Sequence, residues 1–126
     1  MSISIAYGLA GLIGVGIIFI GARFLWDPRA AMAGFGVPVE PLGGPSPRTW
    51  LATKGVRDIG SGLILFAVMA NGGPRALGWF MLAAAFIPIG DAAIVLRSGG
   101  ARAAAYGIHG ATAVVMLALG AFLIAG

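Results

Sequence analysis

The chain alternates between four long apolar blocks and short stretches rich in glycine, proline and charged residues. Each block is about 20 residues long, which is the length that an α-helix needs to cross the hydrocarbon core of a bilayer. The blocks predict membrane spans at about residues 3–24, 48–70, 74–96 and 101–124. We therefore expect an all-α protein, an antiparallel four-helix transmembrane bundle, with residues 1–126 forming a single integral membrane domain.

A short extra helix is expected after the first block. Asp27 is followed by Pro28, and this pair is typical of a helix start, because the carboxylate can cap the helix and proline fits its first turn. The predicted helix covers about residues 28–33 and ends at Gly34 or Gly36. We expect it to lie at the membrane interface. The first block itself lacks the basic start and cleavage motif of a secretory signal, so we interpret it as a retained span.

Prolines mark the remaining boundaries. Residues 38–47 contain four prolines and two glycines, and they predict a loop. Ser46 followed by Pro47 is expected to start the second span, with serine as the cap. Pro88 lies inside the third block, where it removes one backbone hydrogen bond, leaves the carbonyl near Ala84 free and bends the helix.

Glycines in the first block indicate how it packs. Gly11, Gly14 and Gly21 fall on one side of a helix. Such a smooth stripe allows a neighbouring helix to approach closely in lipid. A phosphate-binding glycine loop is a poor interpretation, because no strand–turn–helix pattern surrounds these residues.

Composition supports a membrane protein. The chain is 60% hydrophobic and 10% charged, with a mean hydropathy of +1.00, whereas soluble domains carry about 25% charged residues. Its lack of cysteine excludes disulfides and thiol chemistry. The net charge of +4 does not indicate nucleic-acid binding, because the basic residues lie mostly at span ends, as topology signals do.

The basic residues also predict an orientation. Four successive spans place five of them at one end of the bundle: Arg23, Arg29, Arg48, Arg97 and Arg102. The other end has only Arg75. The positive-inside rule then puts the first end in the cytoplasm and both termini outside. The abundance of alanine, glycine and arginine is typical of a GC-rich bacterial genome, so we expect a multi-pass protein of a bacterial cytoplasmic membrane.

Ionisable residues inside the predicted spans are the candidate site. Lys54, Arg57 and Asp58 lie in the second span, and the third and fourth spans contribute Asp91 and His109. A charge in hydrocarbon costs at least about 2.5 kcal/mol, so such residues usually face a bundle interior or a cavity and have partners. Their depths predict an inward-facing polar pocket in the cytoplasmic half that opens inward or sideways.

Helical spacing adds neighbours to this pocket. Trp50 and Ser61 lie on the same face of the second span as the charged residues, and Tyr106 lies three residues before His109. Lys54 and Asp58 are four residues apart and can pair. Arg57 is adjacent to Asp58 and diverges from it, so we expect Arg57 to seek a partner on another helix.

Several functions fit these residues. Two carboxylates and an imidazole in a low dielectric suit acid–base chemistry, and we expect Asp58, Asp91 and His109 to be catalytic, in isomerisation, cyclisation or ring opening of a lipophilic small molecule. The expected ligand-binding residues are Lys54, Trp50, Arg57, Ser61 and Tyr106. An alternative is a purely structural salt-bridge network, because the charges of the four deep charged residues sum to zero.

Other functional classes have less support in the sequence. Ser61, His109 and Asp91 have the residue types of a hydrolase triad, but no nucleophile-elbow motif surrounds the serine. The spacing is not diagnostic of a metal site, and we expect no metal and no cofactor. A small proton-coupled transporter is an alternative, although small multidrug exporters carry their acidic residue in the first span. An accessory subunit of a membrane complex, or a homo-oligomer, also fits.

The chain resembles a known family through a set of motifs spread over nearly its whole length. They are the glycine-rich first block, Asp27-Pro28 before a glycine-rich loop, Gly55-Val56-Arg57-Asp58-Ile59 with Gly62, and the later Asp91 and His109. This pattern is similar to a family of small four-span membrane proteins catalogued as a domain of unknown function, DUF 4267. The resemblance implies the four-span fold and places Arg57, Asp58, Asp91 and His109 ahead of Lys54 as site residues. It implies no activity.

Overall fold

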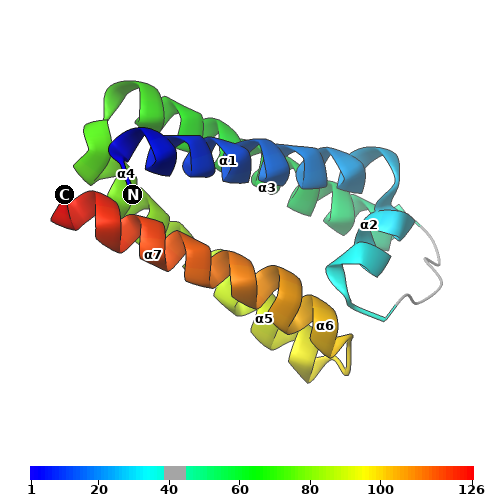
Figure 1. Ribbon diagram of the computed structural model, residues 1–126. Helices are drawn as coiled ribbons and strands as arrows, with labels where there is room; N and C mark the ends of the chain where they lie inside the picture. Colours follow the sequence, from blue (N-terminus) through cyan, green and yellow to red (C-terminus); the bar gives the residue numbers. More distant parts are fainter. Residues whose placement is uncertain (39–44) are drawn as a thin grey trace.

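The computed structural model describes residues 1–38 and 45–126, and this part of the chain is almost entirely helical, with no strand (Figure 1). In chain order the helices are α1 (Ile3–Trp26), α2 (Pro28–Phe35), α3 (Pro45–Asn71), α4 (Gly73–Ala84), α5 (Phe86–Arg97), α6 (Arg102–Ala104), the π-helix η1 (Ala105–Gly110) and α7 (Ala111–Ala125). The prediction of an all-α protein is confirmed.

Three helical segments among the described residues are long and apolar enough to cross a membrane. They are Ile3–Trp26, Gly73–Arg97 and Arg102–Ala125, so the chain is a membrane protein. The predicted second span corresponds to α3, which is 27 residues long. It is not one of the three, because it carries four charged residues: Arg48, Lys54, Arg57 and Asp58.

Glycines bring α1 and α3 together. A Cβ atom added at Gly21 would lie 2.6 Å from the carbonyl oxygen of Gly55, and one added at Gly14 would lie 2.9 Å from the Phe66 ring. On α3, Gly62 lies against the carbonyl oxygen of Gly14, at 2.9 Å from an added Cβ. Side chains larger than hydrogen would hold the helices apart. The predicted role of the glycine stripe in close packing is therefore confirmed for Gly14 and Gly21.

The α4 and α7 helices form a second close pair. An added Cβ at Gly78 would lie 2.9 Å from the carbonyl oxygen of Gly120, and one at Gly120 would lie 2.7 Å from the Leu82 side chain. Figure 1 shows the two pairs converging at the end of the molecule that holds both chain termini and separating toward the end that holds α2, α5 and α6.

A compact apolar core fills the converging end, which we call the closed half. It consists of buried side chains from α1, α3, α4 and α7 together with Ala85: Ala6, Ala10, Leu65, Leu77, Met81, Ala85, Met116, Leu119 and Leu123. None of these residues can form a side-chain hydrogen bond of ordinary strength, so the closed half depends on packing alone.

The α2 helix lies across the opposite end. Its start matches the prediction, because the Asp27 carboxylate accepts a hydrogen bond from the Ala30 N–H at 3.3 Å. The helix runs two residues beyond residue 33 and ends at Gly36, whose φ of 98° requires glycine. The Ala101 N–H donates to the Gly36 carbonyl oxygen at 3.0 Å, which ties α2 to the start of α6.

Two boundaries differ from the prediction. The loop predicted for residues 38–47 is shorter, because α3 begins at Pro45. Ser46 therefore lies inside the first turn and does not precede the helix as a cap. Prolines fit this turn because its N–H groups have no intrahelical partner. Residues 39–44 of the predicted loop lie outside the described part.

Two irregularities interrupt the later helices. A bend is predicted at Pro88, and the structure interrupts the helix three residues earlier, at Ala85 between α4 and α5. The second irregularity was not predicted: Ala105–Gly110 forms the π-helix η1 inside the last apolar block. Short π-helices occur within α-helices and are frequent at functional sites. The two irregular segments lie where the helix pairs separate.

Candidate functional site

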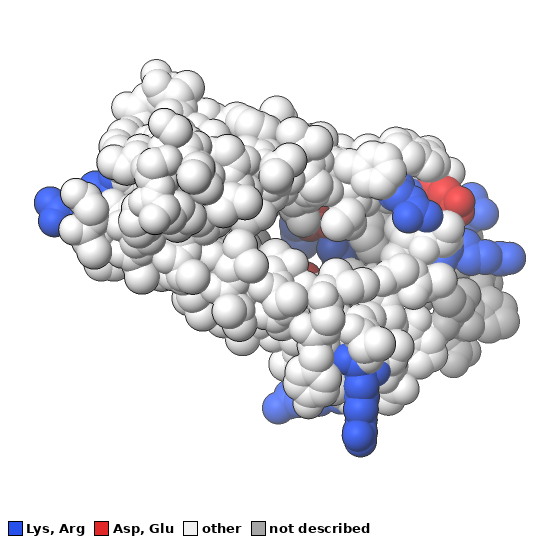
Figure 2. Space-filling view, viewed as in Figure 1, with Lys and Arg blue, Asp and Glu red and all other residues white. Residues whose placement is uncertain are grey.

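A cavity of about 230 Å³ lies between the helix pairs, beside the closed half. Its walls are mostly apolar, and they come from α1, α2, α3, α4, α5, η1 and α7: Ile13, Gly16, Ile17, Ile20, Phe35, Lys54, Asp58, Ser61, Leu65, Phe80, Ala84, Ile87, Pro88, Asp91, Ile108, His109, Thr112 and Met116. Figure 2 shows its opening on the long side of the molecule, between α1 and the η1–α7 segment, with charged atoms visible inside.

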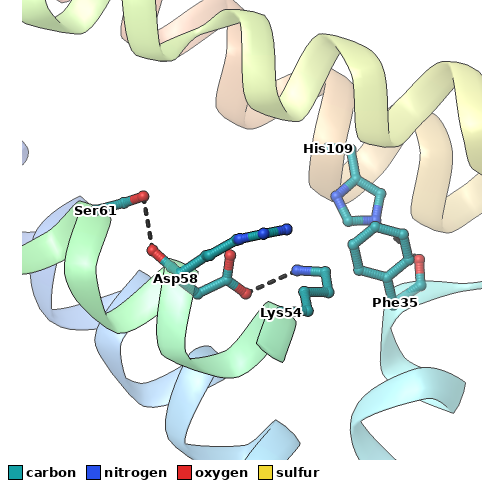
Figure 3. Close-up of polar contacts among 6 residues, drawn as sticks. Phe35, Lys54, Asp58, Ser61 and His109 are labelled. Carbon is teal, nitrogen blue, oxygen red and sulfur yellow. Dashed lines mark hydrogen bonds and ion pairs between the residues drawn. The ribbon is translucent and has the colours of Figure 1, made fainter. Parts of the chain in front are cut away.

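Five of the predicted site residues line this one cavity: Lys54, Asp58, Ser61, Asp91 and His109. Three of them come from α3, and the others come from α5 and η1. Figure 3 shows Lys54 and Asp58 on α3 on one side and His109 on the other, with the Phe35 ring beside His109. The part of the molecule that contains these five residues is called the open half below.

An ion pair occupies the α3 wall. Lys54 Nζ lies 2.7 Å from Asp58 Oδ2, and Asp58 is only 7% exposed. The ammonium also lies 4.7 Å from the centre of the Phe24 ring and 5.0 Å from that of Phe35. Ring faces attract cations. The positive charge of Lys54 is thus balanced by a carboxylate and by two aromatic rings.

His109 is held by the end of α2. It is 8% exposed, and its Nε2 lies 2.8 Å from the Phe35 carbonyl oxygen. A carbonyl oxygen can only accept, so Nε2 must donate, and in the neutral imidazole Nδ1 is then an acceptor. The imidazole and the Phe35 ring are also in contact, with centroids 4.3 Å apart. One residue of α2 thus fixes both the orientation and the tautomer of His109.

Asp91 lies on α5, one turn after Pro88, and both residues line the cavity. Its side chain is half-buried. In residues 1–38 and 45–126, no hydrogen bond or ion pair to the Asp91 carboxylate is present. In this part of the chain, Asp91 is therefore the carboxylate of the cavity wall that makes no direct contact with a cation.

Two hydroxyl groups complete the polar lining. Ser61 Oγ donates to the Arg57 carbonyl oxygen at 2.9 Å, and Thr112 Oγ1 donates to the Ile108 carbonyl oxygen at 2.7 Å. Both bonds run back to the preceding helical turn. The hydroxyl hydrogens are used by the backbone, while the oxygen lone pairs remain available to a ligand.

Three predicted ligand-binding residues do not reach the cavity. Trp50 is 69% exposed near the start of α3, and Tyr106 is 64% exposed. Tyr106 was placed beside His109 by α-helical spacing, but η1 has more residues per turn, so a separation of three no longer returns to the same face. Arg57 is exposed, and within the described residues its side chain has no ion-pair partner, in contrast to the prediction.

Sequence reasoning missed two contributors to the site. Thr112 follows His109 by three residues, so its spacing could have revealed it. Phe35 contributes through its carbonyl oxygen as well as its ring. A main-chain contact between residues 74 positions apart leaves no signal in a single sequence. In the described part of the chain, no three His, Cys, Asp or Glu side chains come close enough to hold a metal ion.

Comparison with known proteins gives one match. A family model described as "Domain of unknown function (DUF4267)" matches residues 14–123. No match was found among curated proteins or among solved structures. The matched region includes every residue that lines the cavity except Ile13.

Proposed function

Since the chain belongs to the DUF4267 family, a family of unknown function, we propose a function from the cavity itself: the protein binds a lipophilic small molecule in an intramembrane polar pocket and carries out acid–base chemistry on it. The observation that carries this proposal is one apolar-walled cavity, open on the long side of the molecule, that collects ionisable residues from α3, α5 and η1. Intramembrane ionisable residues mark substrate or proton pathways more often than stabilising contacts.

The proposal includes a fourth span. At about 1.5 Å per residue, α3 would be about 40 Å long, enough to cross a bilayer. The free-energy costs of placing the Lys54 and Asp58 charges in the membrane are reduced, because the two residues pair with one another inside the bundle. The contacts of Gly14 with Gly62 and of Gly21 with Gly55 run in opposite chain order, which supports an antiparallel bundle.

The proposed orientation in a bacterial cytoplasmic membrane has both termini outside. Figure 2 shows most basic side chains at the end that holds α2 and the turn between α5 and α6, as the positive-inside rule requires of the cytoplasmic side. Because the chain lacks cysteine, single-cysteine variants report cleanly. An impermeant maleimide should label Ser2→Cys in intact cells and Ser98→Cys only after the cells are opened; the reverse pattern would overturn the orientation.

His109 is the proposed proton carrier. Its Nδ1 is the free acceptor, and the Phe35 carbonyl keeps the imidazole in the tautomer that leaves it free. A proton taken from one position of the ligand by Nδ1 and returned at another is an isomerisation, and the same group can serve cyclisation or ring opening. Asp91 supplies negative charge that stabilises the imidazolium formed in between, while Asp58 holds the Lys54 ammonium at 2.7 Å.

The position of Gly16 allows a direct test. Gly16 lines the cavity, and an added Cβ there would meet no atom within 4 Å. Gly16→Leu should therefore fill the space that a ligand needs without disturbing the helices. Gly8 is the matched control, because it lies on the same helix, also has open space around it and does not line the cavity.

The experiment is native mass spectrometry of gently purified protein, followed by analysis of extracted small molecules. Wild type and Gly8→Leu should retain the same bound molecule, and Gly16→Leu should lose it. A cavity that is empty in all three well-folded proteins, or a ligand kept by Gly16→Leu, would contradict the proposal. Once the molecule is identified, its chemical change or its transfer across a bilayer separates an enzyme from the alternative transporter.

A further inference from the structure

Each hydrogen-bond donor group of the cavity wall already has a partner within the described residues. The Nε2–H of His109 donates to the Phe35 carbonyl oxygen. The hydroxyl groups of Ser61 and Thr112 donate to backbone carbonyl oxygens of their own helices. The Lys54 ammonium donates to Asp58 Oδ2 and lies over two aromatic rings. Lys54 uses one of its three N–H donors for Asp58, so it is the donor group of this wall that keeps hydrogen-bonding capacity. The other three groups would have to break a contact before they could donate to a ligand.

The acceptors of the same wall are largely unused. Asp91 has two carboxylate oxygens without a partner in the described part of the chain. Asp58 uses Oδ2 for Lys54, and its Oδ1 accepts no hydrogen bond from the described residues. His109 Nδ1 is an acceptor in the tautomer fixed by Phe35. Apart from the two remaining N–H groups of Lys54, the free hydrogen-bonding capacity of the cavity wall therefore consists of acceptors.

The charged residues of the cavity wall also favour a ligand that donates hydrogen bonds. Lys54 and Asp58 form an ion pair at 2.7 Å, whereas Asp91, which also lines the cavity, has no ion pair within the described residues. A second carboxylate or a phosphate brought into this apolar space would be repelled by Asp91 and would compete with Asp58 for Lys54. A cationic donor would supply the missing partner, as burial of a charge requires.

On these grounds we infer that the ligand is a lipophilic primary amine, bound as its ammonium ion with Asp91 as counter-ion and His109 Nδ1 as a further acceptor. The inference rests on the proposed function and names the ligand class of the same cavity. The apolar body of the amine lies along the α1 side chains Ile17 and Ile20 and reaches the bilayer through the lateral opening. The ammonium points toward α5 and η1.

Three amphiphiles with one alkyl chain test this inference: dodecylamine, 1-dodecanol and dodecanoic acid. Their equal chains give equal hydrophobic contributions, so differences in binding report the head group. Each is titrated into the full-length protein in lipid nanodiscs, and the bound fraction is measured by native mass spectrometry. We expect the amine to bind about tenfold or more tightly than either the alcohol or the acid, because it forms a buried ion pair.

Two variants that each remove one negative charge test whether the preference for the amine depends on Asp91. Asp91→Asn keeps the shape of the side chain and should weaken amine binding to about the level of the alcohol. Asp27→Asn makes the same change outside the cavity and keeps the helix cap, because asparagine caps as well as aspartate. It should leave the ranking unchanged. The ranking in wild type needs no variant, so it remains decisive if Asp91→Asn fails to fold.

The outcomes separate the two proposals. Preferred binding of the acid or the alcohol, lost in Gly16→Leu, would overturn the amine inference and leave the proposed ligand cavity standing. Equal binding of the amine to wild type and a folded Asp91→Asn variant would also overturn the inference. If no amphiphile shows binding that Gly16→Leu reduces, the result counts against both the proposed ligand cavity and the amine inference.

Discussion

The closed and open halves are built from the same long segments, yet different things fill the space between them. In the closed half, apolar side chains such as Leu77 and Met81 are fully buried and meet without polar groups. In the open half the space is a cavity, and its wall holds an ion pair, a carboxylate and a histidine. The difference shows where polar groups are tolerated in a membrane protein: beside a gap that a polar partner can enter.

Backbone regularity separates the halves. Where the helices are regular, glycines bring α1 against α3 and α4 against α7. Where the cavity lies, the third apolar block is broken at Ala85 and the last one contains η1. Breaks and π-helices redirect the chain. Both irregular segments contribute residues to the cavity wall, Pro88 beside the break and His109 in η1.

The largest effect is expected from Gly21→Leu. An added Cβ there would lie 2.6 Å from the carbonyl oxygen of Gly55 and 2.9 Å from the backbone nitrogen of Ile59. Backbone atoms cannot move aside, so α1 and α3 must separate, at a cost of about 3 kcal/mol or more. Unfolding in detergent should show this loss, and Gly16→Leu, five residues away on the same helix, should unfold like wild type. Equal stability of the two variants would contradict the packing of α1 against α3.

Met81→Ala is expected to come next. Met81 is fully buried in the closed half, and removing its side chain leaves a void that costs about 2–5 kcal/mol. Amphiphile binding should be unchanged. Ile17→Ala, which enlarges an existing cavity, should do the opposite and weaken binding with little loss of stability. If Met81→Ala and Ile17→Ala both lower stability, or both weaken amphiphile binding, the contrast between the closed and open halves is wrong.

The ion pair should give a measurable coupling. We expect Lys54→Met and Asp58→Asn to be less than additive when combined, with an interaction energy of about 0.5–3 kcal/mol, because each single change leaves the other group without its partner. Unfolding free energies of the four proteins in the cycle measure it. Full additivity would mean that the contact seen at 2.7 Å has no energetic consequence.

The smallest effect is expected from His109→Phe. It removes the hydrogen bond to the Phe35 carbonyl oxygen, worth about 1 kcal/mol. The end of α2 should loosen, and hydrogen exchange of the Ala101 N–H, which donates to Gly36, should become faster. Tyr106→Phe is the control on the same π-helix and should not change this exchange. Unchanged exchange in His109→Phe would show that the histidine does not hold α2.

The helical class, the start of α2 and the glycine-mediated packing of α1 were the most predictable features. Apolar blocks, the Asp27 cap, the Gly14 and Gly21 stripe and the break near Pro88 depend on residues within a few positions of one another. Local patterns of this kind can be predicted from the sequence, because they depend on residue types at short spacings.

The site was predicted only in part. Lys54, Asp58, Asp91 and His109 line one cavity, as their depths in the predicted spans indicated. Tyr106 was misplaced because an unpredicted π-helix changed the angular spacing around it. The hydrogen bond from His109 to Phe35 could not be predicted from the sequence, because its acceptor is a main-chain oxygen on a distant helix.

The lateral opening of the cavity is the central claim, and spin-label accessibility tests it most directly. Thr112→Cys places a single label at the cavity wall, and Val114→Cys places one on the outer, lipid-facing surface of the same helix. In lipid nanodiscs, both labels should be accessible to oxygen, which dissolves in the bilayer, and inaccessible to a water-soluble nickel complex. A Thr112→Cys label that the nickel complex reaches, or that neither reagent reaches, would contradict a cavity open to the membrane.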